Sequence, residues 1–152
     1  MSFLKHLLPG RASAADHVRQ GQAYLEKGDY RRAIAAFTAA LGVDPGNAAS
    51  YRGRGLAHEE EGEYGRAVAD YTEAIRLDPR SADAYLRRGD AFFAQDDFEQ
   101  AITDYDEAIR LDPNLAPAYQ NRGMAHAEKG EEARARADQE MALRLDPTLS
   151  KR

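Results

Sequence analysis

The chain has 152 residues, of which 43% are hydrophobic and 31% charged, and its formal net charge is −5. This composition is typical of one globular domain and excludes a chain that is disordered throughout. The acidic balance argues against a nucleic-acid surface, which needs clustered Lys and Arg. Cysteine is absent, which excludes disulfides, thiolate metal sites and a cysteine nucleophile and agrees with an expected cytoplasmic location.

Residues 1–13 stand outside the pattern that organises the rest of the chain. Their apolar side chains fall on one face of a short helix: Phe3, Leu4, Leu7 and Leu8. Two interpretations stay open, a disordered tail and an amphipathic piece that docks on the first repeat or on a partner. The apolar run is shorter than the ~7–15 residues of a signal peptide, so export is expected only if the true start lies upstream. No stretch approaches the ~18 apolar residues that span a bilayer.

From residue 14 onward the sequence repeats itself every 34 residues. Residues 67–79 read AVADYTEAIRLDP and residues 101–113 read AITDYDEAIRLDP, with ten of the thirteen positions identical. Prolines recur at the same spacing, at Pro45, Pro79, Pro113 and Pro147. Such periodicity predicts a stack of like units rather than a single core. The expected repeats are 14–47, 48–81, 82–115 and 116–149.

Each repeat contains two segments of helical length with a short break between them. The breaks are Gly28-Asp29, Gly62-Glu63, Asp96-Asp97 and Gly130-Glu131. An acidic residue at this place favours the start of the second helix, and the recurrent proline ends that helix. We predict that Asn47 and Ser81 cap the following first helices, and that Pro117 lies in a first turn. The expected fold is an all-α solenoid of antiparallel helix pairs.

The recurrent positions also match a known pattern of aromatic, glycine, ring, alanine, aromatic and proline. They are Tyr51, Gly55, His58, Ala67, Tyr71 and Pro79, and then Tyr85, Gly89, Phe92, Ala101, Tyr105 and Pro113. Residues 14–149 thereby resemble four tandem repeats of the tetratricopeptide-repeat family. The resemblance implies a right-handed α-solenoid that binds other proteins and is not an enzyme.

Two departures from the family pattern occur together. The residue before the recurrent glycine is Gln20, Arg54, Arg88 or Arg122, where the family usually has Leu. The residue before the second aromatic position is Ala36, Asp70, Asp104 or Asp138. The repeat that lacks Arg also lacks Asp, which predicts the ion pairs Arg54–Asp70, Arg88–Asp104 and Arg122–Asp138. As partly exposed pairs, these are expected to contribute ~0–1 kcal/mol each.

Repeats two and four deviate in ways that concern stability. In repeat four, Glu132, Arg136 and Gln139 replace apolar or aromatic residues, as expected for a terminal unit with a polar outer face. The array is therefore expected to be complete. Repeat two has Gly53 and Gly65 inside its helices, each costing ~0.8–1 kcal/mol, and is predicted to be the softest interior unit.

Candidate chemical groups are few. His58 and His126 occupy a position that holds Tyr24 and Phe92 elsewhere, so we predict packing roles for them and disfavour metal or catalytic ones. The acidic runs 59–61 and 96–97 are predicted to be solvated faces, since neighbouring side chains on a helix diverge. No nucleophile constellation, phosphate-binding loop or metalloprotease signature is present. We therefore predict no enzyme activity, no metal and no cofactor.

The first helices line the inner face of such an array. Some of their side chains are not needed for packing between the repeats. These predicted groove residues are Val18, Gln22, Leu25, Arg52, Leu56, Glu59, Glu60, Leu86, Asp90, Phe93, Gln120 and Met124. They form an apolar strip with an acidic edge, which predicts a groove for a partner segment with apolar anchors and some Lys or Arg. The alternative is that some of them pack against neighbouring repeats.

Two other roles were weighed against this adaptor function. The exposed ends and the apolar segment 3–8 could support self-association, so a monomer or weak homo-oligomer is expected. A groove of this family can also clamp the acidic tail of a chaperone. The corresponding positions are Val18, Gln22, Gly53 and Arg87, or one repeat later Arg52, Leu56, Arg87 and Asn121. Neither set is complete, which disfavours the clamp.

Overall fold

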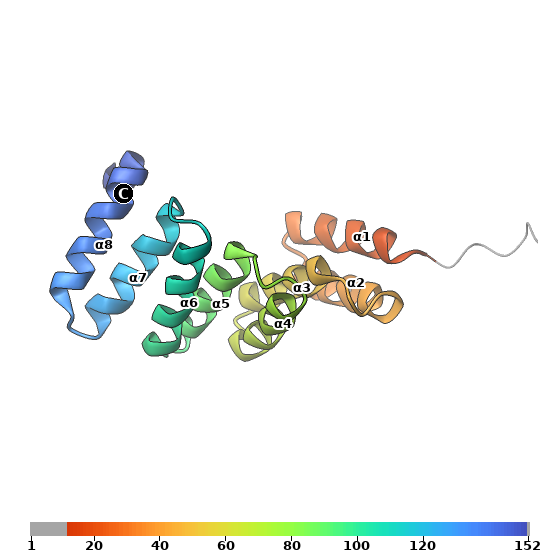
Figure 1. The fold of residues 1–152 in the computed structure, drawn as a ribbon. Coiled ribbons are helices and arrows are strands. Elements are labelled where there is room, and N and C mark those ends of the chain that lie inside the picture. Colours follow the sequence, from red (N-terminus) through yellow and green to blue (C-terminus); the bar gives the residue numbers. More distant parts are fainter. Residues whose placement is uncertain (1–11, 152) are drawn as a thin grey trace, which may run out of the picture.

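The computed structural model describes residues 12–151, so both interpretations of the apolar segment 3–8 lie outside the described residues. This part of the chain contains eight α-helices, one 3-10 helix and no strand (Figure 1). The helices are α1 (Ala14–Glu26), α2 (Tyr30–Val43), α3 (Ala48–Glu60), α4 (Tyr64–Leu77), α5 (Ala82–Ala94), α6 (Phe98–Leu111), α7 (Ala116–Glu128), α8 (Glu132–Leu145) and η1 (Pro147–Lys151). The predicted all-α solenoid of helix pairs is confirmed.

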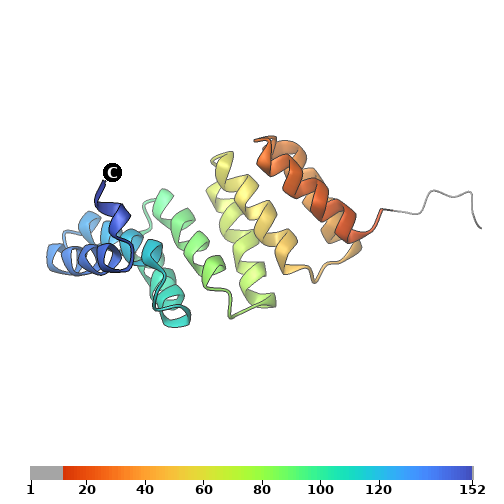
Figure 2. The same cartoon turned by 90° about the horizontal axis from the view of Figure 1, so that it is seen from above.

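The pairs α1/α2, α3/α4, α5/α6 and α7/α8 stack in sequence order, with α1 and α8 at opposite ends (Figure 2). Each first helix contacts the first helix of the next pair, so that α1 touches α3, α3 touches α5 and α5 touches α7. Among residues 12–151, the second helices α2, α4, α6 and α8 make no contact with one another. The first helices therefore lie on the inner side of the curved stack and the second helices on the outer side.

Local chemistry explains where the helices begin. Asn47 and Ser81 accept hydrogen bonds from the backbone N–H of Ser50 and Ala84, at 2.8 and 3.2 Å, as predicted for N-caps. Pro117 lies in the first turn of α7. Ser13 and Asp16 form a capping box at the start of α1, a signal that sequence analysis missed.

The four breaks within the pairs reverse the chain through left-handed backbone. Gly28, Gly62 and Gly130 have φ values of +71°, +75° and +75°, and Asp96 takes the equivalent place at +60°. Asp29 and Asp97 then cap α2 and α6, at N···O distances of 3.3 Å. The carboxylates of Glu63 and Glu131 make no cap bond, because each bonds the histidine of its own pair instead.

The largest fully buried side chains include the rings of Phe37, Tyr71 and Tyr105, one in each of the first three pairs. Each ring lies against the glycine of its partner helix. A Cβ added at Gly21, Gly55 or Gly89 would come within 2.7–2.8 Å of that ring, so only glycine fits there. The ring and the glycine together set the close approach of the two helices in a pair.

The three predicted ion pairs are confirmed. Each arginine donates two N–H···O hydrogen bonds of 2.7–2.9 Å to its aspartate, in the pairs Arg54–Asp70, Arg88–Asp104 and Arg122–Asp138. The expectation that the pairs are partly exposed is wrong for the acidic partners, since the side chains of Asp70, Asp104 and Asp138 are only 4–9% exposed. These are bidentate bonds to largely desolvated carboxylates, and removing one partner costs more than in a surface pair because it leaves a charge poorly solvated.

Each arginine also reaches back to the preceding pair. Its Nη1 donates to Thr38, Thr72 or Asp106, at 3.1, 3.1 and 2.8 Å. The guanidinium of Arg88 further lies over the rings of Tyr85 and Phe92, 5.7 and 6.0 Å from their centroids. One side chain thus joins two helices of its own pair to the second helix before it. The first of the described pairs has Gln20 at this position instead of an arginine.

The two glycines of the second pair differ in role. Gly65 is exposed and its nearest side-chain atom, Gln95 Nε2, would lie 3.7 Å from an added Cβ. Gly53 receives the other face of the Phe37 ring, whose Cε1 would lie 2.7 Å from an added Cβ. Gly53 is therefore a packing requirement rather than a flaw, and the reason given for a soft second repeat holds only for Gly65.

The predicted ion pairs give a first test of stability. Asp104→Ala leaves the Arg88 guanidinium without its carboxylate in a site where Asp104 is 3% exposed. We expect urea denaturation to show a loss of about 2–3 kcal/mol in the free energy of unfolding. Glu73→Ala removes the carboxylate of the surface pair with Arg76 and should cost ~0–1 kcal/mol. Equal losses in the two variants would show that burial of the pair is unimportant.

The glycines of the second pair give a second test, because helix propensity favours alanine at both. Gly65 is the second residue of α4, where propensity matters less than in a helix interior, so Gly65→Ala should raise the free energy of unfolding by at most about 0.5 kcal/mol. Gly53→Ala should lower it, since the new methyl group would collide with the buried ring of Phe37. Thermal unfolding followed by circular dichroism measures both, and a stabilised Gly53→Ala variant would refute the packing role.

Candidate functional site

The inner face contains an open cavity of about 170 Å³ where α1, α3 and α5 meet. Its floor includes the rings of Phe37 and Tyr71, which reach between the first helices from α2 and α4. Leu25 and Leu56 form the apolar wall. The same rings that hold the pairs together thus also provide the base of the inner face.

Charged side chains surround this cavity. Asp83 of α5 lies between two arginines, with its carboxylate oxygens 3.7 Å from Arg52 Nε and 3.8 Å from Arg87 Nε. All three side chains are 42–53% exposed, so they stand at the rim rather than in the floor. Sequence analysis did not name Asp83, and it named Arg87 only as a position of the chaperone clamp. The 34-residue period could have found them, because both repeat the positions of Ala49 and Gly53, which line the same cavity.

Two half-buried carboxylates continue the inner face beyond the cavity. Glu59 accepts a hydrogen bond of 2.7 Å from the hydroxyl of Tyr71. Asp90 accepts one of 2.8 Å from the hydroxyl of Tyr105 and one of 2.7 Å from Asn121 Nδ2, both at its Oδ1. Burial raises the pKa of both carboxyl groups, although these hydrogen bonds act in the opposite direction.

The two tyrosines respond to the same environment. Burial raises the pKa of Tyr71 and Tyr105 well above the usual range, and the neighbouring carboxylates Glu59 and Asp90 add to the shift. Both hydroxyls therefore stay protonated and act as donors. They fix the orientation of the carboxylates on the inner face.

The structure brings together Gln22, Leu25, Arg52 and Leu56 of the predicted groove in this one cavity. Leu86 does not belong to the groove, because it is 8% exposed and packs in the core with Tyr105 and Ala118. Its side chain packs inside the array of helix pairs. Packing against neighbouring repeats is the alternative that the sequence left open. Val18 is likewise partly buried against Phe37.

Two further predicted residues lie at the edge of the inner face. Phe93 packs edge-to-face on Phe98 of α6, with the ring centroids 5.2 Å apart, so it supports the α5/α6 pair. Glu60 lies beside Tyr30 of α2, where its charge raises the pKa of the Tyr30 hydroxyl. Neither residue lines the cavity between α1, α3 and α5.

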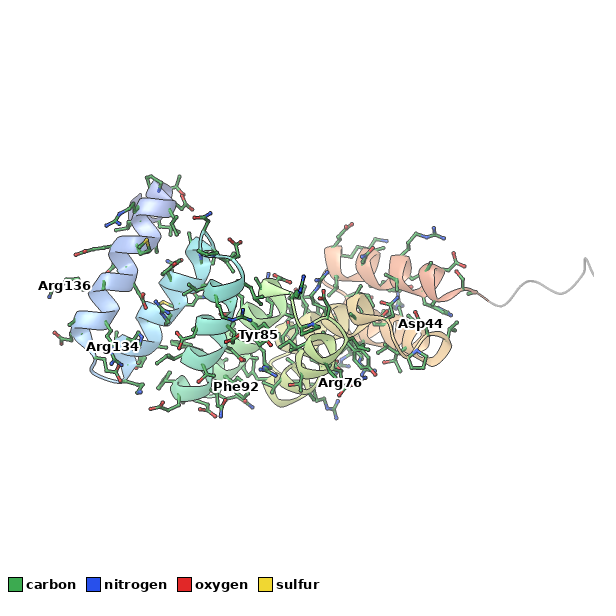
Figure 3. All side chains as sticks on the ribbon, in the orientation of Figure 1. Asp44, Arg76, Tyr85, Phe92, Arg134 and Arg136 are labelled. Carbon is green, nitrogen blue, oxygen red and sulfur yellow. The ribbon has the colours of Figure 1, made fainter. Side chains whose placement is uncertain are left out.

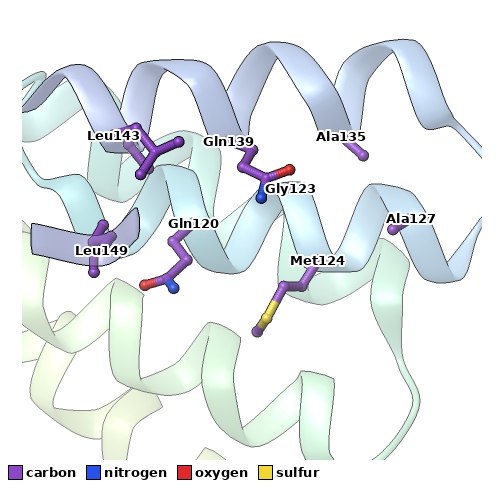
Figure 4. Close-up of a pocket in the computed structure, with 9 residues that line it drawn as sticks. Gln120, Gly123, Met124, Ala127, Ala135, Gln139, Leu143 and Leu149 are labelled. Carbon is purple, nitrogen blue, oxygen red and sulfur yellow. The ribbon is translucent and has the colours of Figure 1, made fainter. Parts of the chain in front are cut away.

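Gln120 and Met124 line a different cavity, of about 240 Å³, at the end of the array (Figure 4). Its walls come from α7, from α8 and from Leu149 of η1. Met124 is 47% exposed and stands at this cavity. Of the twelve predicted residues, four thus line the cavity between α1, α3 and α5 and two line this one.

The histidines are polar connectors as well as packing residues. His58 is 6% exposed, and its Nδ1 hydrogen bonds Glu63 at 2.9 Å while its Nε2 lies 3.8 Å from Asp70. His126 repeats this arrangement with Glu131 and Asp138. Each imidazole connects the start of a second helix to the aspartate of the ion pair.

Residues 12–151 contain no cluster of three or more His, Asp or Glu side chains arranged to hold a metal ion. None of the helices in this same region is both long enough and apolar enough to cross a membrane.

Family models described as tetratricopeptide or TPR repeat match residues 18–82, 89–130 and 116–149. The chain belongs to the tetratricopeptide-repeat family. No curated protein matches it by sequence.

Solved structures of tetratricopeptide-repeat proteins share the fold. MamA is 26% identical, with a TM-score of 0.85 over 91% of this chain and 81% of MamA. The first tetratricopeptide repeat domain of Spaghetti (RPAP3), bound to the HSP90 peptide SRMEEVD, is 28% identical, with a TM-score of 0.76 over 78% of this chain and 94% of that domain. The domain of Arabidopsis OM64 is 25% identical, with a TM-score of 0.75 over 76% of this chain and 96% of that one.

The hydrogen bond from Tyr105 to Asp90 gives a prediction about acidity. Because this bond lowers the pKa of Asp90, Tyr105→Phe should raise that pKa further, as NMR titration of the carboxyl carbon would measure. A raised pKa in the folded state means stability that is present at low pH and is lost as pH rises through it. In the variant, the fall in stability with rising pH should therefore continue to a higher pH than in the wild type. An unchanged titration of Asp90 would contradict the role of the hydroxyl.

Proposed function

We propose that the chain is a non-enzymatic adaptor that binds a segment of a partner protein along its inner face. An apolar side chain of that segment enters the cavity between α1, α3 and α5. Basic side chains of the segment pair with Glu59 and Asp90. The observation that carries the proposal is a mixed surface, with an apolar cavity and half-buried carboxylates presented by first helices on the same inner side.

The cavity suits an apolar anchor. Its floor of aromatic rings and its wall of Leu25 and Leu56 offer a side chain the contacts that water cannot provide. Rim charges on Arg52, Asp83 and Arg87 surround this apolar centre. An apolar centre inside a polar rim is the usual arrangement of a protein–protein contact.

The carboxylates suit a basic neighbour of that anchor. Both described hydrogen bonds to Asp90 fall on Oδ1, so Oδ2 faces no described donor and has capacity for a Lys or Arg of the partner. Burial raises the pKa of Glu59 and Asp90 although the charge of Arg87 lowers it, and a further cation placed beside them would relieve more of that cost. Charge complementarity of this kind selects the partner and speeds its encounter.

An acidic peptide fits the inner face less well. The RPAP3 domain was solved with the HSP90 peptide SRMEEVD, whose end is acidic. In the present chain the arginines at the cavity, Arg52 and Arg87, already share the carboxylate of Asp83. An acidic tail would also face Glu59 and Asp90, so we favour a partner segment with basic residues.

A display selection from random peptides tests the proposal. The enriched sequences should combine an apolar residue with nearby Lys or Arg. Leu56→Glu places a charge in the cavity wall and should weaken binding by about tenfold or more, as measured by fluorescence anisotropy.

Val43→Glu is the matched control, because Val43 is an exposed apolar residue, 57% exposed, at the end of the outer helix α2. It should leave binding unchanged. If Leu56→Glu folds normally and still binds the selected peptides, the inner face is not the binding site. Enrichment of acidic peptides would instead favour the tail-binding alternative.

A further inference from the structure

The cavity at the C-terminal end of the array resembles one side of the interface between two helix pairs, without the pair that would form the other side. At the interface between α5/α6 and α7/α8, several residues of α6 pack in one cluster with two alanines of α7, and three of them have counterparts at the end cavity. These three α6 residues are Tyr105, Ala108 and Ile109, and the alanines are Ala118 and Ala125. The α8 residues 34 positions later, Gln139, Ala142 and Leu143, all line the end cavity.

The end cavity is also enlarged. The aromatic ring of each earlier pair fills the space between its own glycine and the next first helix, as Phe37 does between Gly21 and Gly53. In the last pair Gln139 replaces that ring, and an added Cβ on Gly123 would meet only backbone and short side-chain atoms. The result is the cavity of about 240 Å³, with Met124 and Leu149 beside it (Figure 4).

Two charged residues of α8 lie at positions that face the following helix elsewhere in the array. Glu140 takes the position of Asp106, which accepts the hydrogen bond of Arg122. Arg136 takes the position of Ile102, which packs against the cluster containing Ala125, and it projects from α8 away from the array (Figure 3). Both residues are exposed, and neither forms an ion pair among the side chains that the structure describes.

We propose that this end face binds an amphipathic helix of a partner protein that stacks on α7/α8 in the manner of a further first helix. The helix carries a large apolar residue at position i, Arg at i+4 and Asp or Glu at i+7. The apolar residue fills the cavity that Gln139 leaves, the arginine pairs with Glu140, and the acidic residue pairs with Arg136. These three positions share one face of a helix.

The spacing comes from the chain's own interfaces between helix pairs. Ala118, Arg122 and Ala125 of α7 stand at i, i+4 and i+7 and face α6 in this way. The equivalent residues at position i, which are Ser50, Ala84 and Ala118, are at most 1% exposed. At those interfaces a small residue is enough, because an aromatic ring fills the space beside it. The end cavity lacks that ring, so a larger residue is needed at position i to fill it.

A second copy of this chain fits the end face poorly. Its α1 would bring Asp16 to position i and Gln20 to position i+4. An aspartate would then enter a cavity whose lining holds two glutamine amides but no cation, and Glu140 would face an amide instead of a guanidinium. The geometry therefore favours a different protein over head-to-tail stacking. The binding does not depend on the inner face.

The test uses the full chain and peptides of residues 118–129, which begin at position i because Leu149 and the rest of η1 already occupy the places of residues 115–117. The probe peptide carries Ala118→Phe and Ala125→Glu, and the unmodified peptide is its matched control. Because isolated helices of this length are marginal in water, the probe is expected to bind weakly but measurably by isothermal titration calorimetry. Its affinity should exceed that of the control by about tenfold, since it adds a buried ring and an ion pair.

Two variants of the full chain locate the binding. Gln139→Tyr fills the cavity as Tyr105 does, and should reverse the preference in favour of the unmodified peptide. Glu140→Arg should weaken the probe by about tenfold, and Arg122→Glu in the probe should restore its binding to that variant. Leu56→Glu on the inner face should have no effect.

The proposal is overturned if the probe fails to bind, or if it binds equally well to the wild type and to both end-face variants. Light scattering tests the remaining possible occupant of the end face, a second copy of this chain. A dimer that forms with increasing concentration and dissociates in Glu140→Arg would assign the end face to a second copy, against the proposal. Loss of probe binding in Leu56→Glu would place the probe on the inner face and would also overturn it.

Discussion

An aromatic ring held against a glycine is the contact on which the rest of this molecule depends. In the first three pairs, Phe37, Tyr71 and Tyr105 occupy the space that a missing Cβ leaves. The ring closes its own pair, and in the case of Phe37 it also reaches Gly53 of the next pair. Phe37 and Tyr71 also form the floor of the inner cavity, and the hydroxyls of Tyr71 and Tyr105 orient Glu59 and Asp90. Scaffold and candidate binding surface are therefore built from the same side chains.

The arginines add a second, directional connection between the pairs. Hydrophobic contacts between helices leave some freedom to slide, whereas a guanidinium that bonds one aspartate and one neighbouring helix fixes the register. Arg122 is the most strongly held, because both of its partners, Asp106 and Asp138, are carboxylates. In a repeat protein each unit contacts only its neighbours, so these bridges decide how stiffly the inner face is presented to a partner.

The last pair shows what happens when the ring is removed. Gln139 leaves the end of the array with a cavity instead of a closed joint, and Arg136 makes its outer face polar. A polar outer face keeps the terminal unit from exposing a large apolar area. The inner face and the end face thus differ in chemistry. The inner face offers aromatic rings with half-buried carboxylates, and the end face offers an aliphatic cavity with one exposed charge of each sign.

The sequence by itself determined the fold, the helix breaks and the three ion pairs, because a 34-residue period repeats each local choice in the same place. It could not decide which inner-face residues stay available. Leu86 and Leu56 are both leucines of first helices. Leu86 is nevertheless buried in the core around Tyr105, while Leu56 lines the cavity. The same limit applies to Gly53, which propensity marks as a weakness and which the ring of Phe37 requires. Burial depends on what the neighbouring pair places opposite each side chain, and only the tertiary structure fixes that.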